Sequence, residues 1–590
     1  MARLDPHSYA DLEQGRTREI AWEIDVSFAE KVMEGRVTLF LEEAGGGPLD
    51  LDSRGLEILS VCDGAGADLP YEVSEPEGFM GSRLRLERST PADVITIRYR
   101  TSPSATALQW LEGEQTSGGR LPFMFSQCQA IHARSIVPCQ DTPAARFSYS
   151  AEVRVPGDLV AVMAAAPGAW ADLGDGRRRY SFEMPQRIPS YLLALAVGNL
   201  VSRDLGPRTR VYAEPEVLDA ASWEFEGAED MLNAAEELFG PYHWDRFDFL
   251  VMPPAFPYGG MENPRLTFLT PTLLAGDRSM VNVLAHELAH SWTGNLVTNA
   301  TMNDFWLNEG FTVWAERRIL ERLEGREFAA LHAVLGLNGL RGALEQFGDD
   351  SVWTWLHTDM KGVDPDEVYS LVPYEKGFLF VRLLEDALGR EEFDRFIKSY
   401  MDKFAFQSIT TEMFIEFFEG KYPGVLEQVG AEGWLHGPGL PGNAPLARSE
   451  RFEGVSRAVA GFLERGESPS VHAGGWHSEE WILFLQALPR PLTVEQCASL
   501  DGEFGFSKAG NSEILSHWLV IAIGSNYEPA YASAESFLKR VGRGKYLKPL
   551  FRALMGNPGT AALGRRIFEE AKVGYHPIVR EGLAALVGAG

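Results

Sequence analysis

Hydrophobic and polar residues alternate over much of the first 210 residues. Trp22, Ile24, Val26 and Phe28 are separated by polar neighbours, and a similar alternation recurs at residues 37–41 and 95–99. A period of two predicts strands that bury one face. Turns rich in Gly, Pro and Asp separate these segments. We therefore expect a largely antiparallel β domain over residues 1–212.

From about residue 215 the spacing of apolar residues lengthens to three and four, as in Met231, Leu232, Ala235 and Leu238. This spacing predicts helices, and the apolar run 247–252 predicts a short strand among them. The pattern ends in residues 436–445, H-G-P-G-L-P-G-N-A-P, which indicate a linker. We expect a mixed, mostly helical domain over residues 213–446.

Beyond the linker the chain is amphipathic with helical spacing and carries no strand pattern. Residues 481–488, 514–523 and 547–555 illustrate it. We expect an all-α domain over residues 447–590, and stacked helix pairs would suit it. At 590 residues the chain is too long for one hydrophobic core, so the predicted fold class is multidomain α+β.

Composition narrows the range of partners and compartments. The 83 acidic residues exceed the 54 basic ones, a net charge of −29 that opposes binding to nucleic acid or anionic membranes. No segment approaches the roughly 20 apolar residues of a membrane span, and the first residues lack an apolar signal core. The four cysteines form no C-x-x-C pair and are expected to be reduced core residues, namely Cys62, Cys128, Cys139 and Cys497. A cytoplasmic protein without an obligate protein partner is expected.

Residues 286–290, H-E-L-A-H, carry the clearest chemical signal. In a helix His286 and His290 share one face, and Glu287 between them is free to act as a base. Apolar residues at helical spacing, from Met280 to Trp292, favour a helix packed on the core. The alternative is an accidental pair of core histidines.

Glu309 follows His290 after eighteen intervening residues, on a second expected helix in which Gly310 is a weak point. Two histidines and a carboxylate bind zinc and leave one position for water, whose pKa falls to about 7. The sequence therefore predicts one zinc ion per chain, bound by His286, His290 and Glu309, and metal-assisted hydrolysis.

Residues 258–264, Y-G-G-M-E-N-P, precede the histidine motif. The paired Gly259 and Gly260 allow the backbone to approach a ligand closely, and Glu262 supplies a negative charge. An ordinary turn is the alternative on these residues alone.

Together, G-G-M-E-N, H-E-x-x-H and the distal glutamate resemble the joint signature of the zinc aminopeptidases of the gluzincin clan, the M1 family. The resemblance implies that Glu262 binds the free α-amine of a peptide and that residues 258–261 (Tyr258, Gly259, Gly260, Met261) line the substrate site. Residues 126–132, 138–143, 364–377 and 438–441 resemble the leukotriene A4 hydrolase branch. That branch implies a saddle-like β domain, a thermolysin-like catalytic domain and a C-terminal domain of stacked helix pairs.

Further roles follow from the same resemblance. It implies that Tyr374 hydrogen-bonds the tetrahedral oxyanion, a task suited to a phenol, and that Gln129 helps to hold the amino terminus. Arg543 and Lys545 match a pair that receives a substrate carboxylate, although basic residues on a helical surface are usually only solvated.

Asp366 and Tyr369 match positions of that branch's epoxide hydrolase pocket. Phe311 departs from the pattern, where a histidine is expected. The predicted function is removal of N-terminal residues from short peptides, with hydrolysis of a fatty-acid epoxide as the alternative. A catalytically silent binding protein is disfavoured because the ligands and Glu287 are all present, and Glu262 argues against an endopeptidase.

Overall fold

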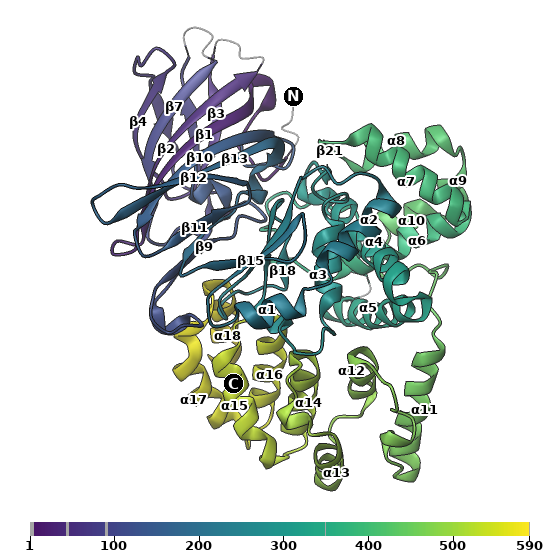
Figure 1. Ribbon diagram of the computed structural model, residues 1–590. Coiled ribbons are helices and arrows are strands. Elements are labelled where there is room, and N and C mark those ends of the chain that lie inside the picture. Colours follow the sequence, from purple (N-terminus) through teal and green to yellow (C-terminus); the bar gives the residue numbers. More distant parts are fainter. Residues whose placement is uncertain (1–4, 43–46, 89–92, 349, 589–590) are drawn as a thin grey trace.

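The computed structural model describes residues 5–42, 47–88, 93–348 and 350–588. Three bodies lie side by side (Figure 1): strands at the start of the chain, a mixed central body, and helices at the end of the chain.

The N-terminal domain is built on a seven-stranded sheet in the order β12-β13-β10-β1-β2-β7-β4. β1 (Arg16–Ser27) and β2 (Val32–Glu42) are antiparallel, with Trp22 opposite Val37, whereas β1 runs parallel to β10 (Arg146–Pro156). The alternating residues of these strands form its core, as predicted. The other strands are β3 (Leu49–Ser53), β4 (Glu57–Asp63), β5 (Tyr71–Val73), β6 (Ser82–Leu86), β7 (Val94–Arg100), β8 (Leu108–Leu111), β9 (Phe123–Ser126), β11 (Val160–Met163), β12 (Ala166–Asp172), β13 (Arg177–Pro189) and β14 (Leu195–Gly198).

A separate five-stranded sheet belongs to the central domain and begins earlier than the sequence pattern indicates. Its order is β15-β16-β17-β19-β18, with β16, β17 and β19 parallel and an antiparallel strand at each edge. Because β15 pairs with β16 and β16 pairs with β17, we place the division between the first two domains near residue 200 and not at 212. The strands are β15 (Val201–Asp204), β16 (Thr209–Ala213), β17 (Phe247–Val251), β18 (Gly260–Met261) and β19 (Leu266–Leu269).

Helices cover this sheet, and α3 and α4 pack against each other. Gly310, expected to weaken α4, is a contact point: a Cβ there would lie 2.7 Å from Cα of Gly377 in α6. The remaining elements are α1 (Leu218–Glu224), α2 (Ala228–Phe239), α3 (Val281–Ala289), β20 (Val297–Asn299), α4 (Trp306–Glu324), α5 (Arg326–Phe347), the π-helix η9 (Val372–Lys376), α6 (Gly377–Leu388), α7 (Arg390–Phe404), β21 (Gln407–Ile409), α8 (Thr411–Lys421), α9 (Val425–Gln428) and α10 (Ala431–Leu435).

The C-terminal domain is helical throughout its described residues, as predicted. It follows a segment without helix or strand between Leu435 and Glu450, in which the expected division at 446 falls. Successive packing of α11 on α12, α12 on α14, α14 on α16 and α16 on α18 builds a stack. Its helices are α11 (Glu450–Arg465), α12 (Ser478–Ala487), α13 (Val494–Phe504), α14 (Ser512–Gly524), α15 (Tyr531–Arg540), α16 (Gly544–Gly556), α17 (Ala561–Ala571) and α18 (Pro577–Gly588).

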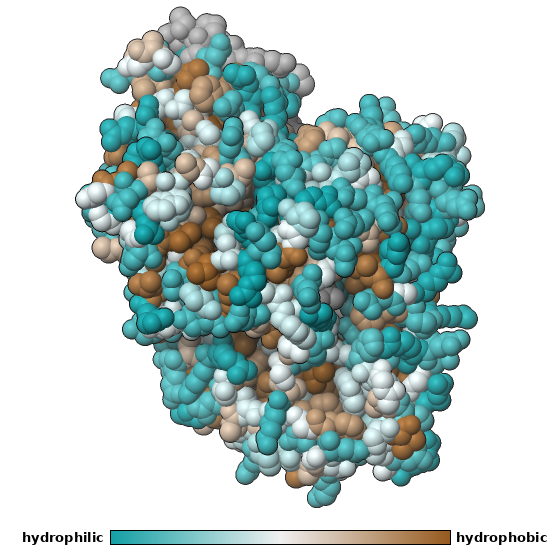
Figure 2. Space-filling model, in the orientation of Figure 1, coloured by the Kyte–Doolittle hydropathy of each residue, from teal (hydrophilic) through white to brown (hydrophobic). Residues whose placement is uncertain are grey.

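The surface is largely hydrophilic on the side drawn in Figure 2. Within the described residues, no helix has the length and apolar character needed to cross a membrane. All four cysteines are free thiols, and three are buried as expected, while Cys62 is only half-buried.

Candidate active site

Helices α3 and α4 bring the three predicted metal ligands together. The Nε2 atoms of His286 and His290 lie 3.2 Å apart, and Oε2 of Glu309 lies 3.4 Å from the first and 3.6 Å from the second. Leu284 and Leu288 are buried on α3, so packing of this helix on the core fixes where both imidazoles point.

The three side chains fit a zinc ion. In a tetrahedral site with bonds of about 2.05 Å, neighbouring ligand atoms are about 3.3 Å apart, close to the separations found here. The Nδ1 atoms of both histidines face acceptors, Glu316 and the Thr293 carbonyl, which leaves each Nε2 of a neutral ring with a lone pair. Oε2 of Glu309 is buried and has no hydrogen-bond partner in the structure. Three electron-pair donors that face one another at these separations suit a bound cation.

Glu316 and Thr312 hold the histidines in place, and the sequence pattern missed both. His286 Nδ1 donates to Glu316 Oε2 at 3.0 Å, and Thr312 Oγ1 lies 3.2 Å from His290 Nδ1. Such partners orient a ligand ring and raise its basicity. Glu316 stands two helical turns beyond Glu309 on the same face of α4, a spacing that could have indicated it.

Glu287 lies in the site beside the glycine strand β18. It is buried, and a Cβ at Gly260 would lie 2.1 Å from its Oε1, so only glycine permits this approach. Burial, together with the charge of Glu309 and against the opposing charge of His286, raises the pKa of Glu287 to about 8. A carboxyl group that titrates near neutral pH can both accept and return a proton.

Glu262 follows β18 and is buried at 4% exposure. The Asn295 side chain donates to its backbone carbonyl at 2.7 Å, whereas its carboxylate Oε1 is buried without a partner in the structure. Burial, together with the charges of Glu309 and Glu287, raises the pKa of Glu262 well above its usual value. The site thus contains a carboxylate oxygen, Oε1 of Glu262, that lacks a hydrogen-bond donor.

Residues 258–261 precede Glu262 in the chain, and Gln129 belongs to the segment that contacts them through Gln127. Met261 is buried and Tyr258 is half-buried, and Gln127 donates to the Met261 sulfur at 3.2 Å. Gln129 is half-buried two residues further along that segment. The hydrogen bond to the glycine strand therefore comes from Gln127, which the sequence analysis did not single out.

Tyr374 faces the metal ligands from the π-helix η9. Its ring is stacked on the His286 ring at 6.1 Å between centroids, and its hydroxyl is hydrogen-bonded to that of Tyr369. Burial and the Glu309 charge raise the pKa of Tyr374 well above its usual value. The phenol therefore stays protonated and can donate.

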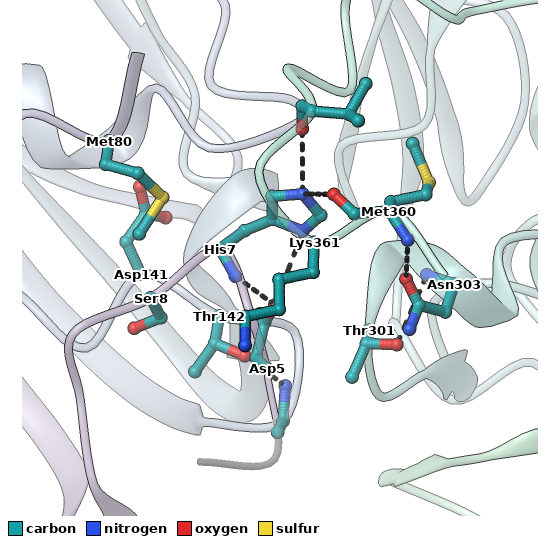
Figure 3. Close-up of polar contacts among 12 residues, drawn as sticks. Asp5, His7, Ser8, Met80, Asp141, Thr142, Thr301, Asn303, Met360 and Lys361 are labelled. Carbon is teal, nitrogen blue, oxygen red and sulfur yellow. Dashed lines mark hydrogen bonds and ion pairs between the residues drawn. The ribbon is translucent and has the colours of Figure 1, made fainter. Parts of the chain in front are cut away.

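The loop before η9 carries Asp366 and is held by the N-terminal domain. His132 Nε2 donates to Asp366 Oδ2 at 2.7 Å. His7 Nε2 donates to the carbonyls of Met360 and Val363 at 3.1 and 3.0 Å (Figure 3). Asp366 is thus engaged with His132, a residue not proposed from the sequence.

Arg543 reaches the site from the C-terminal domain. The amides of Gly542 and Gly544 donate to the carbonyls of Pro254 and Pro257 at 2.8 and 3.2 Å, which docks this segment beside the glycine strand. A Cβ at Gly259 would lie 2.5 Å from Arg543 Nη2. The structure therefore places Arg543 beside Gly259, and its role in substrate binding stays a prediction.

Lys545 points elsewhere. Its ammonium group pairs with Glu513 Oε1 at 2.5 Å and its side chain is 56% exposed. Although burial opposes ionisation, Lys545 and Arg543 hold the pKa of Glu513 at about 2. Phe311 also lies away from the pocket: it is buried and stacked on Tyr400 at 5.4 Å, so its departure from the expected histidine affects the core.

Two histidines and a glutamate around one point, with an acid on the same helix, define a zinc metallopeptidase. Comparison with family models agrees: the peptidase family M1 domain matches residues 223–434, the M1 N-terminal domain residues 6–192, and the leukotriene A4 hydrolase C-terminal domain residues 476–587. The chain belongs to the M1 family of zinc metallopeptidases, in the group that carries the leukotriene A4 hydrolase C-terminal domain.

Relatives match over nearly the whole length. Leukotriene A-4 hydrolase of Xenopus laevis is 39% identical, covering 93% of each chain, and leucine aminopeptidase 2 of Pyricularia oryzae is 38% identical, covering 98% of this chain and 97% of that one. Among solved structures, yeast LTA4 hydrolase in complex with bestatin superimposes with a TM-score of 0.93 at 33% identity, over 99% of this chain and 97% of that one. The three-domain architecture and the zinc cofactor follow from this membership.

Proposed function

We propose that this chain is an aminopeptidase that removes N-terminal residues from short peptides. The observation that carries the proposal is that Oε1 of the buried Glu262 carboxylate has no hydrogen-bond donor. The metal-binding atoms of Glu262, Glu287 and His290 lie within 4.8 Å of one another, so a group bound to Glu262 is adjacent to the metal ligands.

A free α-ammonium group is the partner that this carboxylate lacks. It would supply charge and up to three hydrogen-bond donors to a buried acceptor, which is worth more than a neutral contact. Gln129 is proposed to assist from the neighbouring segment. An internal peptide bond offers no cation at this position, so the arrangement favours cleavage after the first residue.

The hydrolytic step is assigned to residues around the ligands. His286, His290 and Glu309 would hold the zinc ion, which when bound supplies Lewis acidity and makes hydroxide available near neutral pH. Glu287 takes a proton from water at its carboxylate and passes it to the leaving amine. The Tyr374 hydroxyl donates to the oxygen on which negative charge develops.

Arg543 is proposed to bind the C-terminal carboxylate of the peptide. Its planar guanidinium can bind a carboxylate through two parallel hydrogen bonds, and its side chain lies against Gly259 in the substrate strand. Lys545 supports it indirectly, because both basic groups face Glu513. Tripeptides are the expected good substrates.

Epoxide hydrolysis is the second candidate, since Asp366 and Tyr369 are both near the site. An apolar cavity beside Tyr369 has a volume of only about 60 Å³, with Phe305, Trp355 and Leu356 in its wall. This space suits the side chain of an amino acid better than a long acyl chain. Asp366 is also engaged with His132, so peptide hydrolysis remains the main proposal.

The compartment is proposed on the chemistry of the thiols. The four cysteines are unpaired, which fits a reducing environment such as the cytoplasm.

Hydrolysis of aminoacyl-chromophore substrates beside their N-acetylated forms, with and without a zinc chelator, tests the function. We expect chelator-sensitive cleavage of the free-amine forms alone, and loss of that selectivity in Glu262→Gln. Equal cleavage of the blocked forms would contradict the role of Glu262. Absence of any cleavage would favour the epoxide reaction.

A further inference from the structure

A second cavity lies on the other side of α4 from the zinc ligands. It has a volume of about 630 Å³ and is enclosed by α4, α5, α6 and residues 445–448, which lead into the C-terminal domain. At 100° per residue, its α4 wall is on a different face of the helix from Glu309 and Glu316. That wall comprises Trp314, Arg317, Arg318 and Glu321. The proposed aminopeptidase reaction does not use this cavity.

Arginine dominates the charge of the cavity although the whole chain is strongly acidic. Six arginines and three acidic residues line it, namely Arg317, Arg318, Arg326, Arg382, Arg390 and Arg448 with Glu321, Glu385 and Asp386. Behind the wall, Asp394 pairs with Arg318 at 2.6 Å and Glu375 pairs with Arg317 at 2.8 Å. Within the wall, Glu321 pairs with Arg326 at 3.1 Å and with Arg390 at 2.9 Å, and Asp386 pairs with Arg382 at 2.6 Å. Arginine outnumbers carboxylate by one, and both Arg326 and Arg448 are exposed.

Arg317 is the buried member of this set, with only 8% of its side chain exposed. Its Nη2 donates to Glu375 and to the His332 carbonyl, and its Cζ lies 3.9 Å above the Phe378 ring. Its Nε and Nη1 are buried and have no hydrogen-bond partner in the structure. Buried donors of this kind are costly unless an acceptor reaches them.

We propose that this cavity binds an organic anion that carries a phosphate group. Phosphate oxygens accept several hydrogen bonds at once and match the planar arginine fork. The volume lies within the roughly 300–1,000 Å³ of small-molecule sites. Apolar side chains suited to the organic part of the ligand complete the wall: Ala329, Ala330, Ala333, Pro445, Leu446 and Ala447.

Arg317 connects the cavity to the zinc site. It follows Glu316, which holds His286, and it binds Glu375, the neighbour of Tyr374 in η9. A phosphate bound to the free N–H groups of Arg317 would therefore act on both Glu316 and Glu375. Occupancy is expected to change kcat of peptide hydrolysis. This consequence rests on the proposed aminopeptidase function, whereas binding to the cavity does not.

Calorimetric titration of the full-length zinc-loaded protein with adenosine monophosphate and with inorganic phosphate tests the site. Sodium chloride holds the ionic strength constant. We expect saturable binding of one equivalent, tighter for the nucleotide, and weakening by about tenfold in the double variant Arg326→Ala with Arg448→Ala. Both positions are exposed, so the fold should persist. Arg341→Ala, an exposed position on α5 outside the cavity, is the matched control.

Three results would overturn the site: no saturable binding, equal affinity in the double variant, or loss of binding in Arg543→Ala with the double variant unaffected. The last would place the phosphate at the substrate-carboxylate position. Affinity does not depend on turnover, so these outcomes are distinct from failure of the aminopeptidase proposal. A kcat that nucleotide leaves unchanged at saturation would exclude the link through Arg317.

Discussion

Glu316 accepts a hydrogen bond from His286 at 3.0 Å across the contact between α4 and α3. The carboxylate fixes which nitrogen of the ring carries the proton, and thus leaves the other nitrogen for the metal. Glu316→Gln is expected to weaken zinc binding by about 10- to 100-fold, measured by competition with a fluorescent chelator. Glu324→Gln at the exposed end of the same helix should bind zinc as the unaltered protein does; equal affinity in both variants would refute the role of Glu316.

Glu287 is expected to matter for turnover and not for metal binding. Because Glu287 is proposed to take the proton from water and is not one of the three proposed ligands, Glu287→Gln should keep one zinc per chain while kcat falls by about 10²- to 10⁴-fold. Metal analysis of the purified variant and steady-state kinetics give the two values. Loss of zinc would mean that Glu287 belongs to the ligand set.

Substitutions at the adjacent Gly259 and Gly260 should affect substrate binding and bond cleavage separately. A methyl group at Gly260 would meet Glu287 Oε1 at 2.1 Å, and one at Gly259 would meet Arg543 Nη2 at 2.5 Å. Gly260→Ala is therefore expected to lower kcat for every substrate. Gly259→Ala should mainly raise KM for tripeptides, with little effect on aminoacyl-chromophores that lack a carboxylate. Gly342→Ala on α5, where a Cβ meets nothing within 4 Å, is the control.

Glu513 should make stability depend on pH in the acid range. Despite burial, its two basic neighbours hold its pKa at about 2, below the ordinary 4.5. The unfolded chain therefore binds a proton that the folded protein does not, so this stabilisation is present above pH 4.5 and is lost as pH falls toward 2. Glu513→Gln should lower Tm at neutral pH, and the difference from the unaltered protein should shrink with acidification. The exposed Glu416→Gln should show no such trend.

Two of the three zinc ligands could be predicted because their geometry is local. His286 and His290 are one turn apart in a single helix, so spacing alone places both on one face. His132 could not be found in this way, and the spacing of Glu316 from Glu309 indicates its face of α4 but not its partner. The partners of Glu316 and His132 lie 30 and 234 residues away, and only the packing of α4 on α3 and of the N-terminal domain on the loop brings them together.

The domain division illustrates a different limit. Strand β16 has the same alternating pattern as the preceding domain, and period alone does not show which sheet a strand joins. The pairing of β16 with β17 shows that it belongs to the sheet of the central domain. Lys545 shows the converse. The sequence predicts that Arg543 and Lys545 form a basic pair for a substrate carboxylate, but the Lys545 ammonium group pairs with the buried Glu513.

On the roles proposed for Glu262 and Arg543, the docking of residues 542–544 on Pro254 and Pro257 sets the length of peptide that fits the site. Glu262 belongs to the central domain and Arg543 to the C-terminal one, and the amide hydrogen bonds of Gly542 and Gly544 help to fix the distance between them. A small rotation of the helical stack would change that distance. The preferred length of the peptide would then be a property of how the domains are assembled, whereas the residues proposed to cleave the bond all belong to the central domain.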